Sequence, residues 1–207
     1  GLAVSANIPL IEVHHIDGHI HAAWLNYPQL GSNPQFPFVC MIASGGHTEL
    51  ILMKDHGVYK KLGQTLDDAA GEAFDKIGRL LGLGFPGGPK VEAAAQKAKE
   101  EIILPRAWLK GTSNFSFSGL KTATLQTIQK FEKEEQMSSD KIASIARAFQ
   151  NSVVEVLVKK TVDVCDNYNA NGIIIGGGVA ANKFLRDEMI AKSNIPVFCP
   201  ELKLCTD

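Results

Sequence analysis

The chain has 207 residues, 45% of them hydrophobic and 21% charged, a balance that predicts a folded core and excludes a disordered polymer. Its 21 basic and 22 acidic residues give a formal charge of −1, so contact with nucleic acid would need a local basic patch. No apolar run approaches the roughly 18 residues that cross a bilayer, so we expect no membrane segment. Four cysteines without CxxC spacing indicate reduced thiols and a cytoplasmic location.

The first part of the chain predicts strands and one helix. Residues 8–13 form a short β-type run, and the histidine-rich stretch after them has helical spacing. A segment rich in Pro, Gly and Asn at 26–37 predicts a linker. Residues 38–66 predict three antiparallel strands with turns at Gly45–Gly46 and Asp55–Gly57.

The second part of the chain is mainly helical. The predicted helices span about 67–82, 85–100, 119–135 and 139–167. An unbroken apolar run at 172–175 predicts a fully buried strand, followed by a glycine-rich turn, a helix and a strand at 195–199. Three antiparallel strands, then helices, then a parallel βαβ unit predict an α/β fold.

Four histidines lie within residues 14–21 and raise the question of a metal site. His15 and His19 are four residues apart, which places both imidazoles on one helix face, one turn apart. Two neutral nitrogen donors suit Zn or Fe(II), although a third ligand must come from elsewhere. His14 and His21 fall on another face, and Asp17 with His21 is a rival pair of the same spacing. The alternative is a helix whose histidines cap, pack and face water.

Two glycine-rich turns have both a structural and a functional interpretation. The turn at 44–49 is either a tight hairpin or a cradle in which backbone N–H groups face a phosphate. Gly176, Gly178 and Ala181 fit the dinucleotide-binding pattern GxGxxA, with Glu201 about 20 residues later for a ribose hydroxyl. The antiparallel strands before this turn argue against that pattern. A nucleotide at a glycine turn and helix N-terminus fits in either case.

Four acidic residues crowd the start of the helix predicted at 67–82. They are Asp67, Asp68, Glu72 and Asp75. The helix dipole alone explains the first two. Asp75 is the better candidate for binding a polar ligand, with solvated surface as the alternative.

Six motifs together resemble the TsaD family of bacterial and organellar tRNA adenosine threonylcarbamoyltransferases, formerly described as O-sialoglycoprotein endopeptidases. In chain order they are VHHIDGH, SGGHTEL, DDAAGEAFDKIGRLLGLGFPGGP, SFSGLKTA, GGGVAANKFLR and CTD. The resemblance implies the actin/sugar-kinase/Hsp70-like ATPase fold, in which nucleotide lies between two ribonuclease-H-like lobes. The dinucleotide match is then a chance overlap.

The resemblance also implies a set of site residues and ligands. One divalent ion, Fe or Zn, would be bound by His15, His19 and Asp207. The nucleotide ligand would be threonylcarbamoyl-AMP, or ATP or AMP. Its contacts would be Ile42, Ala43, Ser44, Gly45 and Gly46 for the threonylcarbamoyl phosphate, Asp75 and Gly88 for the ribose, and Asn182. A further family contact, often Asp, falls on Glu92 here.

The implied reaction transfers the threonylcarbamoyl group from its AMP anhydride to the exocyclic amine of the tRNA adenine next to the anticodon. A small paralogous subunit and an ATPase are implied as partners. Residues 1–35 would end the first lobe and 36–207 would form a truncated second lobe, so we expect the chain alone to be poorly active. The alternatives are a metal-dependent glycoprotein endopeptidase, a non-catalytic nucleotide-binding scaffold and an NAD-binding module.

Overall fold

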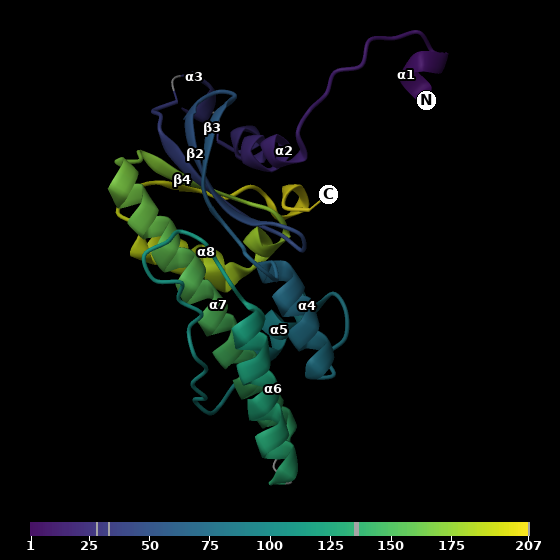
Figure 1. The fold of residues 1–207 in the computed structure, drawn as a ribbon, viewed down its shortest axis with the longest axis vertical. Helices are drawn as coiled ribbons and strands as arrows, with labels where there is room; N and C mark the ends of the chain where they lie inside the picture. Colours follow the sequence, from purple (N-terminus) through teal and green to yellow (C-terminus); the bar gives the residue numbers. More distant parts are fainter. Residues whose placement is uncertain (28, 33, 135–136, 207) are drawn as a thin grey trace.

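A single five-stranded sheet organises the chain (Figure 1). The computed structural model describes residues 1–27, 29–32, 34–134 and 137–206. The strands are β1 (Phe38–Ala43), β2 (Thr48–Asp55), β3 (Val58–Gln64), β4 (Gly172–Gly176) and β5 (Val197–Phe198), in the spatial order β3-β2-β1-β4-β5. The pairs β1–β2 and β2–β3 are antiparallel, whereas β1–β4 and β4–β5 are parallel. This topology confirms the predicted α/β fold.

The central strand β1 is buried on both faces of the sheet. Val39, Met41 and Ala43 point into one core, whereas Phe38 and Cys40 point into a second core on the opposite face. Because successive side chains of a strand alternate between faces, a strand covered on both sides needs apolar residues at every position. This requirement explains the unbroken run FVCMIA.

Helices form a layer on the first face, where the longest of them packs on the sheet and the others pack mainly against it or against one another. They are α4 (Ala70–Leu80), α5 (Gly87–Ala95), α6 (Ser118–Lys133), α7 (Ser139–Tyr168) and α8 (Lys183–Lys192). The longest, α7, runs across this face and continues past the sheet beside α6 (Figure 1). It ends at Asn169, whose left-handed backbone (φ 48°) stops the helix. Short 3-10 turns, η2 (Gly178–Ala181) and η3 (Leu202–Leu204), flank α8 and β5.

A smaller helical layer covers the second face. It consists of α2 (His15–His21), η1 (Ala22–Leu25) and α3 (Gln29–Ser32). Ile16, Ile20 and Ala23 of this layer pack against Cys40 and Ile174 of the sheet. The predicted helix after residue 13 is confirmed. The linker at 26–37 stays a prediction, because α3 and the buried Leu30 lie within it and Pro28 and Asn33 lie outside the described residues. The division into lobes at residue 35 stays a prediction.

The strand predicted at 8–13 is wrong. These residues carry no secondary structure, and together with the short α1 (Leu2–Ser5) they extend away from the rest of the chain (Figure 1). Ile8, Leu10 and Val13 are exposed. A strand is stabilised by backbone hydrogen bonds to a neighbouring strand, and the described residues place none beside this run.

No helix among the described residues is long and apolar enough to span a bilayer.

Candidate functional site

The α2 helix brings His15 and His19 together. Their ring centroids are 4.7 Å apart, with the planes inclined at 68°. His19 is buried, and its backbone carbonyl faces Gly176 at the end of β4. A Cβ at Gly176 would stand 3.0 Å from that oxygen, so the glycine permits the close approach of α2 to the sheet. The two imidazoles therefore share one face of α2, as their spacing predicts.

The other histidines of the stretch have separate contacts. His14 caps α2, because its Nδ1 accepts a hydrogen bond of 3.3 Å from the backbone N–H of Ile16. His21 places Nδ1 2.9 Å from the backbone oxygen of Asp17, and its ring stacks against that of His56. The rival pair of Asp17 and His21 is thus joined through a backbone carbonyl rather than by two side-chain ligands.

The third predicted metal ligand, Asp207, lies outside the described residues. The residue before it, Thr206, lies beside Gly178, where an added Cβ would be 3.6 Å from its Cγ2. Gly178 is two residues from Gly176, which contacts His19. Among the described residues, no group of three or more His, Cys, Asp or Glu side chains is arranged to hold an ion. The two-histidine donor set fits a metal, and the complete site stays a prediction.

Arg186 anchors the segment that leads to Thr206. Its guanidinium donates hydrogen bonds to the backbone oxygens of Ala180 and Pro200, and it lies 3.0 Å from Sγ of Cys205. The contacts tie residues 200–205 to the glycine-rich turn after β4. Burial raises the pKa of the Cys205 thiol despite the nearby guanidinium. Sequence reasoning missed Arg186, although it stands in the motif GGGVAANKFLR.

The β1–β2 turn is built by its own hydrogen bonds. Ser44 Oγ accepts from the backbone N–H groups of Gly46 and His47, at 3.4 and 3.1 Å. The backbone oxygen of Ser44 accepts from Gly71 at 3.0 Å, which joins the turn to the first residues of α4. A Cβ at Gly71 would meet Ser44 at 2.6 Å, so this glycine is needed for the contact. Gly45 and Gly46 are exposed at the tip.

The first two residues assigned to this loop differ from the rest. Ile42 and Ala43 are fully buried strand residues, and Ile42 belongs to the core under α2. Their side chains therefore serve packing, and contact with a ligand is restricted to the backbone. Structurally, the turn forms a tight hairpin between β1 and β2. Its exposed glycines are also compatible with the anion-cradle interpretation.

Most of the predicted substrate residues line one cavity of about 430 Å³. It opens between the β1–β2 turn, the α4 and α5 helices and the turn after β4. Five of its lining residues were assigned from the sequence: Gly45, Asp75, Gly88, Glu92 and Asn182. Apolar walls come from Phe74, Pro86, Pro89, Val179, Ala181 and Leu202, and Thr206 also lines the cavity. Ile42, Ala43, Ser44 and Gly46 do not line it.

Three polar side chains of the cavity, those of Asp75, Glu92 and Asn182, also hold a helix end. Asp75 Oδ1 accepts from the backbone N–H of Gly87 at the start of α5, at 2.7 Å. Glu92 Oε1 accepts from the backbone N–H of Lys183 at the start of α8, also at 2.7 Å. Asn182 caps α8 by accepting from the Leu185 N–H at 2.9 Å. These contacts fix the carboxylates of Asp75 and Glu92 in the cavity wall. Each contact uses one carboxylate oxygen, so the second oxygen of each side chain is not used by it.

Both polar atoms of the Asn182 side-chain amide make hydrogen bonds within the protein. Its Nδ2 donates to Oε1 of Gln150 at 2.9 Å, and both side chains are buried. Gln150 was not identified from the sequence, although a polar residue on the apolar face of α7 was a signal of a specific partner. Asn182 is thus primarily a residue that shapes the turn beside the cavity.

Two glycines leave open space in the cavity wall. A Cβ at Gly45 or Gly88 would meet no described atom within 4 Å. In contrast, a Cβ at Gly87 would stand 2.4 Å from the backbone oxygen of Phe74. Gly87 therefore serves helix packing, whereas a side chain at Gly88 would fill space available to a ligand.

The family profile described as tRNA N6-adenosine threonylcarbamoyltransferase (TsaD) matches residues 1–207. The chain belongs to the TsaD family. Relatives of that name include proteins from Dehalococcoides mccartyi (47% identical, all of this chain and 60% of the relative), Thermomicrobium roseum (48%, 96% and 60%) and Bacillus subtilis (44%, all and 59%). This TsaD chain thus spans about 60% of the length of these relatives.

Solved structures support the fold of this TsaD chain. The crystal structure of T. kodakarensis HypF superposes with a TM-score of 0.69 at 14% identity, covering 97% of this chain and 35% of HypF. A full-length HypF in the phosphate- and nucleotide-bound form gives the same TM-score over 95% of this chain and 34% of that protein. The fold class is that of the actin/sugar-kinase/Hsp70-like ATPases, as the sequence motifs imply.

The position of Glu201 argues against the dinucleotide-binding alternative. Glu201 does not line the cavity, and it accepts a hydrogen bond from Asn26 at 2.8 Å while pairing with Lys203 at 2.7 Å. The side chain is on the surface beside η3, because β5 is only two residues long and the chain turns away after it. The GxGxxA match of this TsaD chain therefore lacks the ribose contact that defines a dinucleotide site.

Proposed function

We propose that this chain supplies the nucleotide and metal site of an enzyme that transfers a threonylcarbamoyl group from threonylcarbamoyl-AMP to the N6 amine of the tRNA adenine next to the anticodon. One observation carries the proposal. In a chain of the TsaD family, Gly45, Asp75, Gly88, Glu92 and Asn182 line a single cavity, and Thr206, which also lines it, directly precedes the predicted ligand Asp207.

The cavity suits an adenylate. Apolar walls such as Phe74 and Val179 favour a flat base and the faces of a ribose. Asp75 and Glu92 each use one oxygen for a helix end, so the other can accept from a ribose hydroxyl. Gly88 leaves room for the sugar. These features support AMP, or ATP, as the nucleotide part of the ligand.

The β1–β2 turn suits the acyl phosphate. Gly45 and Gly46 carry no side chain at the exposed tip, so a phosphate oxygen can approach their backbone N–H groups. Ser44 stabilises the turn from within, and Ile42 and Ala43 hold its base in the core. In this proposal the turn orients the donor, and Ile42 to Ser44 act through the shape of the backbone.

We include in the proposal one Fe or Zn ion bound by His15, His19 and Asp207. The neighbouring imidazoles, with ring centroids 4.7 Å apart, support two of the three positions. When bound, such an ion acts as a Lewis acid that polarises the carbamoyl carbonyl. His19 is buried on the side of α2 that faces the sheet, with its backbone carbonyl against Gly176, which limits the freedom of the donor pair.

The reaction has a simple balance. The lone pair of the adenine N6 forms the new C–N bond, and the C–O bond to the AMP phosphate breaks with its electron pair remaining on AMP. One proton leaves N6 for solvent. Because AMP is a good leaving group, the main demand on the protein is to position a weakly nucleophilic amine at the carbonyl carbon.

The partners belong to the same proposal. A tRNA is the acceptor, and a small paralogous subunit and an ATPase are proposed by family resemblance alone. The four thiols, of which three are buried and one is half-buried, support a reducing location such as the cytoplasm.

The direct test is ligand binding by calorimetry. We expect one AMP, or one non-hydrolysable analogue of threonylcarbamoyl-AMP, to bind per chain and more tightly than NAD. In a transfer reaction with tRNA and the partner proteins, we expect labelled threonine to enter the tRNA. Tighter binding of NAD would contradict the proposal, and glycoprotein cleavage that a chelator abolishes would favour the endopeptidase. Nucleotide binding without any bound metal would favour the scaffold.

A further inference from the structure

A second cavity, of about 500 Å³, lies on the other side of the β1–β2 turn. It opens between the first turns of α2 and the face of β2 and β3. Its lining residues are His14, Ile16, Asp17, Ile20, His47, Glu49, Ile51, Tyr59 and Lys61. The proposed function uses no residue of this cavity.

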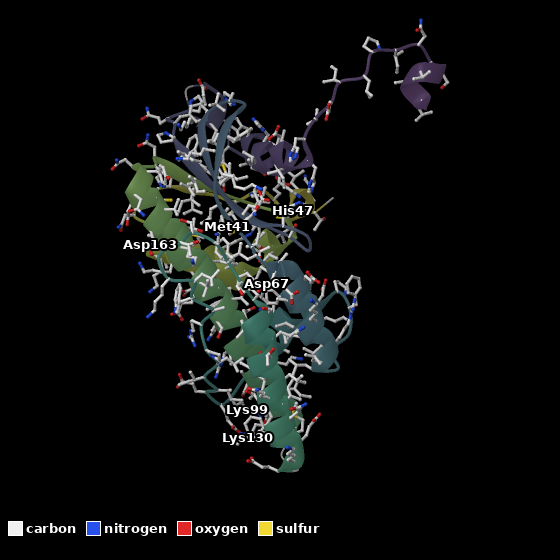
Figure 2. All side chains as sticks on the ribbon, in the orientation of Figure 1. Met41, His47, Asp67, Lys99, Lys130 and Asp163 are labelled. Atoms are coloured by element: carbon white, nitrogen blue, oxygen red, sulfur yellow. The ribbon has the colours of Figure 1, made fainter. Side chains whose placement is uncertain are left out.

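The two cavities are joined through one short turn. Gly45 lines the nucleotide cavity, and His47, two residues later, lines the second one. The ring of His47 lies 5.4 Å from that of His15, centroid to centroid. Figure 2 labels His47 at this end of the sheet, next to α2. The β1–β2 turn therefore contributes residues to both cavities, and the ring of His15 lies beside it.

The second cavity combines apolar and polar lining residues. Ile16 and Ile51 contribute small apolar edges at 5% and 6% exposure, with the fully buried Ile20 behind them, and Tyr59 adds a partly exposed aromatic ring. The hydroxyl oxygen of Tyr59 is buried and makes no hydrogen bond of ordinary geometry to the described residues. The ring, rather than the hydroxyl, is thus the part of Tyr59 that a ligand would contact.

Two carboxylates, those of Asp17 and Glu49, line this cavity as well. Glu49 pairs with Lys61 at 2.8 Å, and the carboxylate of Asp17 is close enough to raise the pKa of Tyr59, after the larger effect of burial. Carboxylates accept hydrogen bonds from an exocyclic amine, and an aromatic ring stacks on a base. An unstacked nucleobase in an RNA loop is recognised by this combination of contacts.

The geometry points to this second cavity as the subsite for the acceptor base, the unstacked adenine of an RNA loop. The inference rests on the proposed function, because it assigns the donor to the nucleotide cavity and the acceptor to its neighbour. The adenine would lie against the ring of Tyr59, with its exocyclic amine toward the carboxylates of Asp17 and Glu49. Its N6 would then approach the donor from the His47 side of the turn.

The test measures binding of an anticodon stem-loop RNA with adenosine next to the anticodon, and separately of AMP. We expect Tyr59→Ala to weaken binding of the RNA about tenfold or more, which corresponds to the loss of one base–aromatic stack. Tyr59→Phe keeps the ring and should bind the RNA like the wild type. Lys60→Ala is the control, because Lys60 is the next residue along β3 and lies over the ring of Tyr168, outside the cavity. AMP affinity should be unchanged in all three variants.

The outcomes separate the two proposals. Weaker RNA binding in Tyr59→Ala alone, at constant AMP affinity, supports the subsite. Unchanged RNA binding in Tyr59→Ala, or an equal loss in Lys60→Ala, would overturn it while AMP binding by the wild type still supports the proposed function. A second RNA carries an abasic site in place of the adenosine. If Tyr59→Ala weakens binding of this RNA as much as it weakens binding of the intact stem-loop, the subsite is overturned, because the effect does not involve the base. A wild type that binds no AMP would contradict the proposed function itself.

Discussion

The carboxylate of Asp75 on α4 accepts a hydrogen bond of 2.7 Å from the backbone N–H of Gly87, the first residue of α5. The same side chain lines the nucleotide cavity. One residue thus holds two helices together and presents a carboxylate oxygen to the proposed ribose position.

Asp75→Asn separates these two roles. The amide oxygen can still accept from Gly87, so we expect the free energy of unfolding to change by less than about 1 kcal/mol. AMP affinity should fall about tenfold, because hydrogen bonds to a charged acceptor are stronger than those to a neutral one. Thermal unfolding and calorimetry measure the two effects. Unchanged AMP affinity in this variant would remove Asp75 from the ribose site.

Gly87 and Gly88 form a matched pair of adjacent glycines. Gly87→Ala should destabilise the protein by about 1–3 kcal/mol, because its Cβ would stand 2.4 Å from the backbone oxygen of Phe74. Gly88→Ala should keep or raise the stability by up to about 1 kcal/mol, since alanine favours the helix and meets no described atom. Its methyl group should nevertheless weaken AMP binding. Normal AMP affinity in Gly88→Ala would show that no ligand occupies that part of the cavity.

The metal proposal predicts a contrast within α2. We expect His15→Ala and His19→Ala to lose bound iron or zinc, as measured by mass spectrometry of the purified protein. His21→Ala is the control, because its ring packs against Trp24 and His56 on another side of the helix. Equal metal content in all three variants would exclude the site.

Asp67 predicts a pH dependence of stability. Burial raises the pKa of this carboxyl, but hydrogen bonds from Ser116, Ser118 and the backbone N–H of Phe117 outweigh it, so the net pKa lies below the ordinary value. The unfolded chain therefore binds a proton more readily than the folded one. The stabilisation is complete above the ordinary pKa and is lost as the pH falls through the lowered one.

The corresponding variant is Asp67→Asn. We expect it to be less stable than the wild type at pH 7, and the difference should shrink as the pH falls from 5 toward 2. Asp163→Asn, which removes a surface ion pair with Lys159, is the control (both aspartates are labelled in Figure 2). A difference that stays constant down to pH 2 would contradict the lowered pKa of Asp67.

Thiol labelling should follow burial. Burial raises the pKa of Cys165 to about 12 and that of Cys40 further, so both should resist labelling in the folded protein. Cys199 is only partly buried and should react first. Arg186→Ala should make Cys205 reactive, because Arg186 ties residues 200–205 to the turn after β4. Labelling of Cys205 at equal rates in wild type and variant would argue against that anchoring role.

Local patterns in the sequence were sufficient to predict many of the strands, turns and helices. The turns at Gly45–Gly46 and Asp55–Gly57 depend on nearest neighbours, and the apolar run of β1 reflects burial on both faces. Asp67 shows the limit of local reasoning. From the sequence, the helix dipole of α4 was an adequate explanation for Asp67. In the structure, the carboxylate of Asp67 accepts hydrogen bonds from Phe117 and Ser118 at the start of α6, about 50 residues later.

The sequence by itself determined what depends on spacing along one element: the shared face of His15 and His19 follows from the helical repeat alone. Only the tertiary structure decided which distant residues meet. It placed Asp75, Glu92 and Asn182 around one cavity, set Glu201 apart from it and, within the described part of the chain, put no strand beside residues 8–13. The physical reason is that a helix contains its own hydrogen-bond partners, whereas a strand or a cavity exists only when segments far apart in the chain pack together.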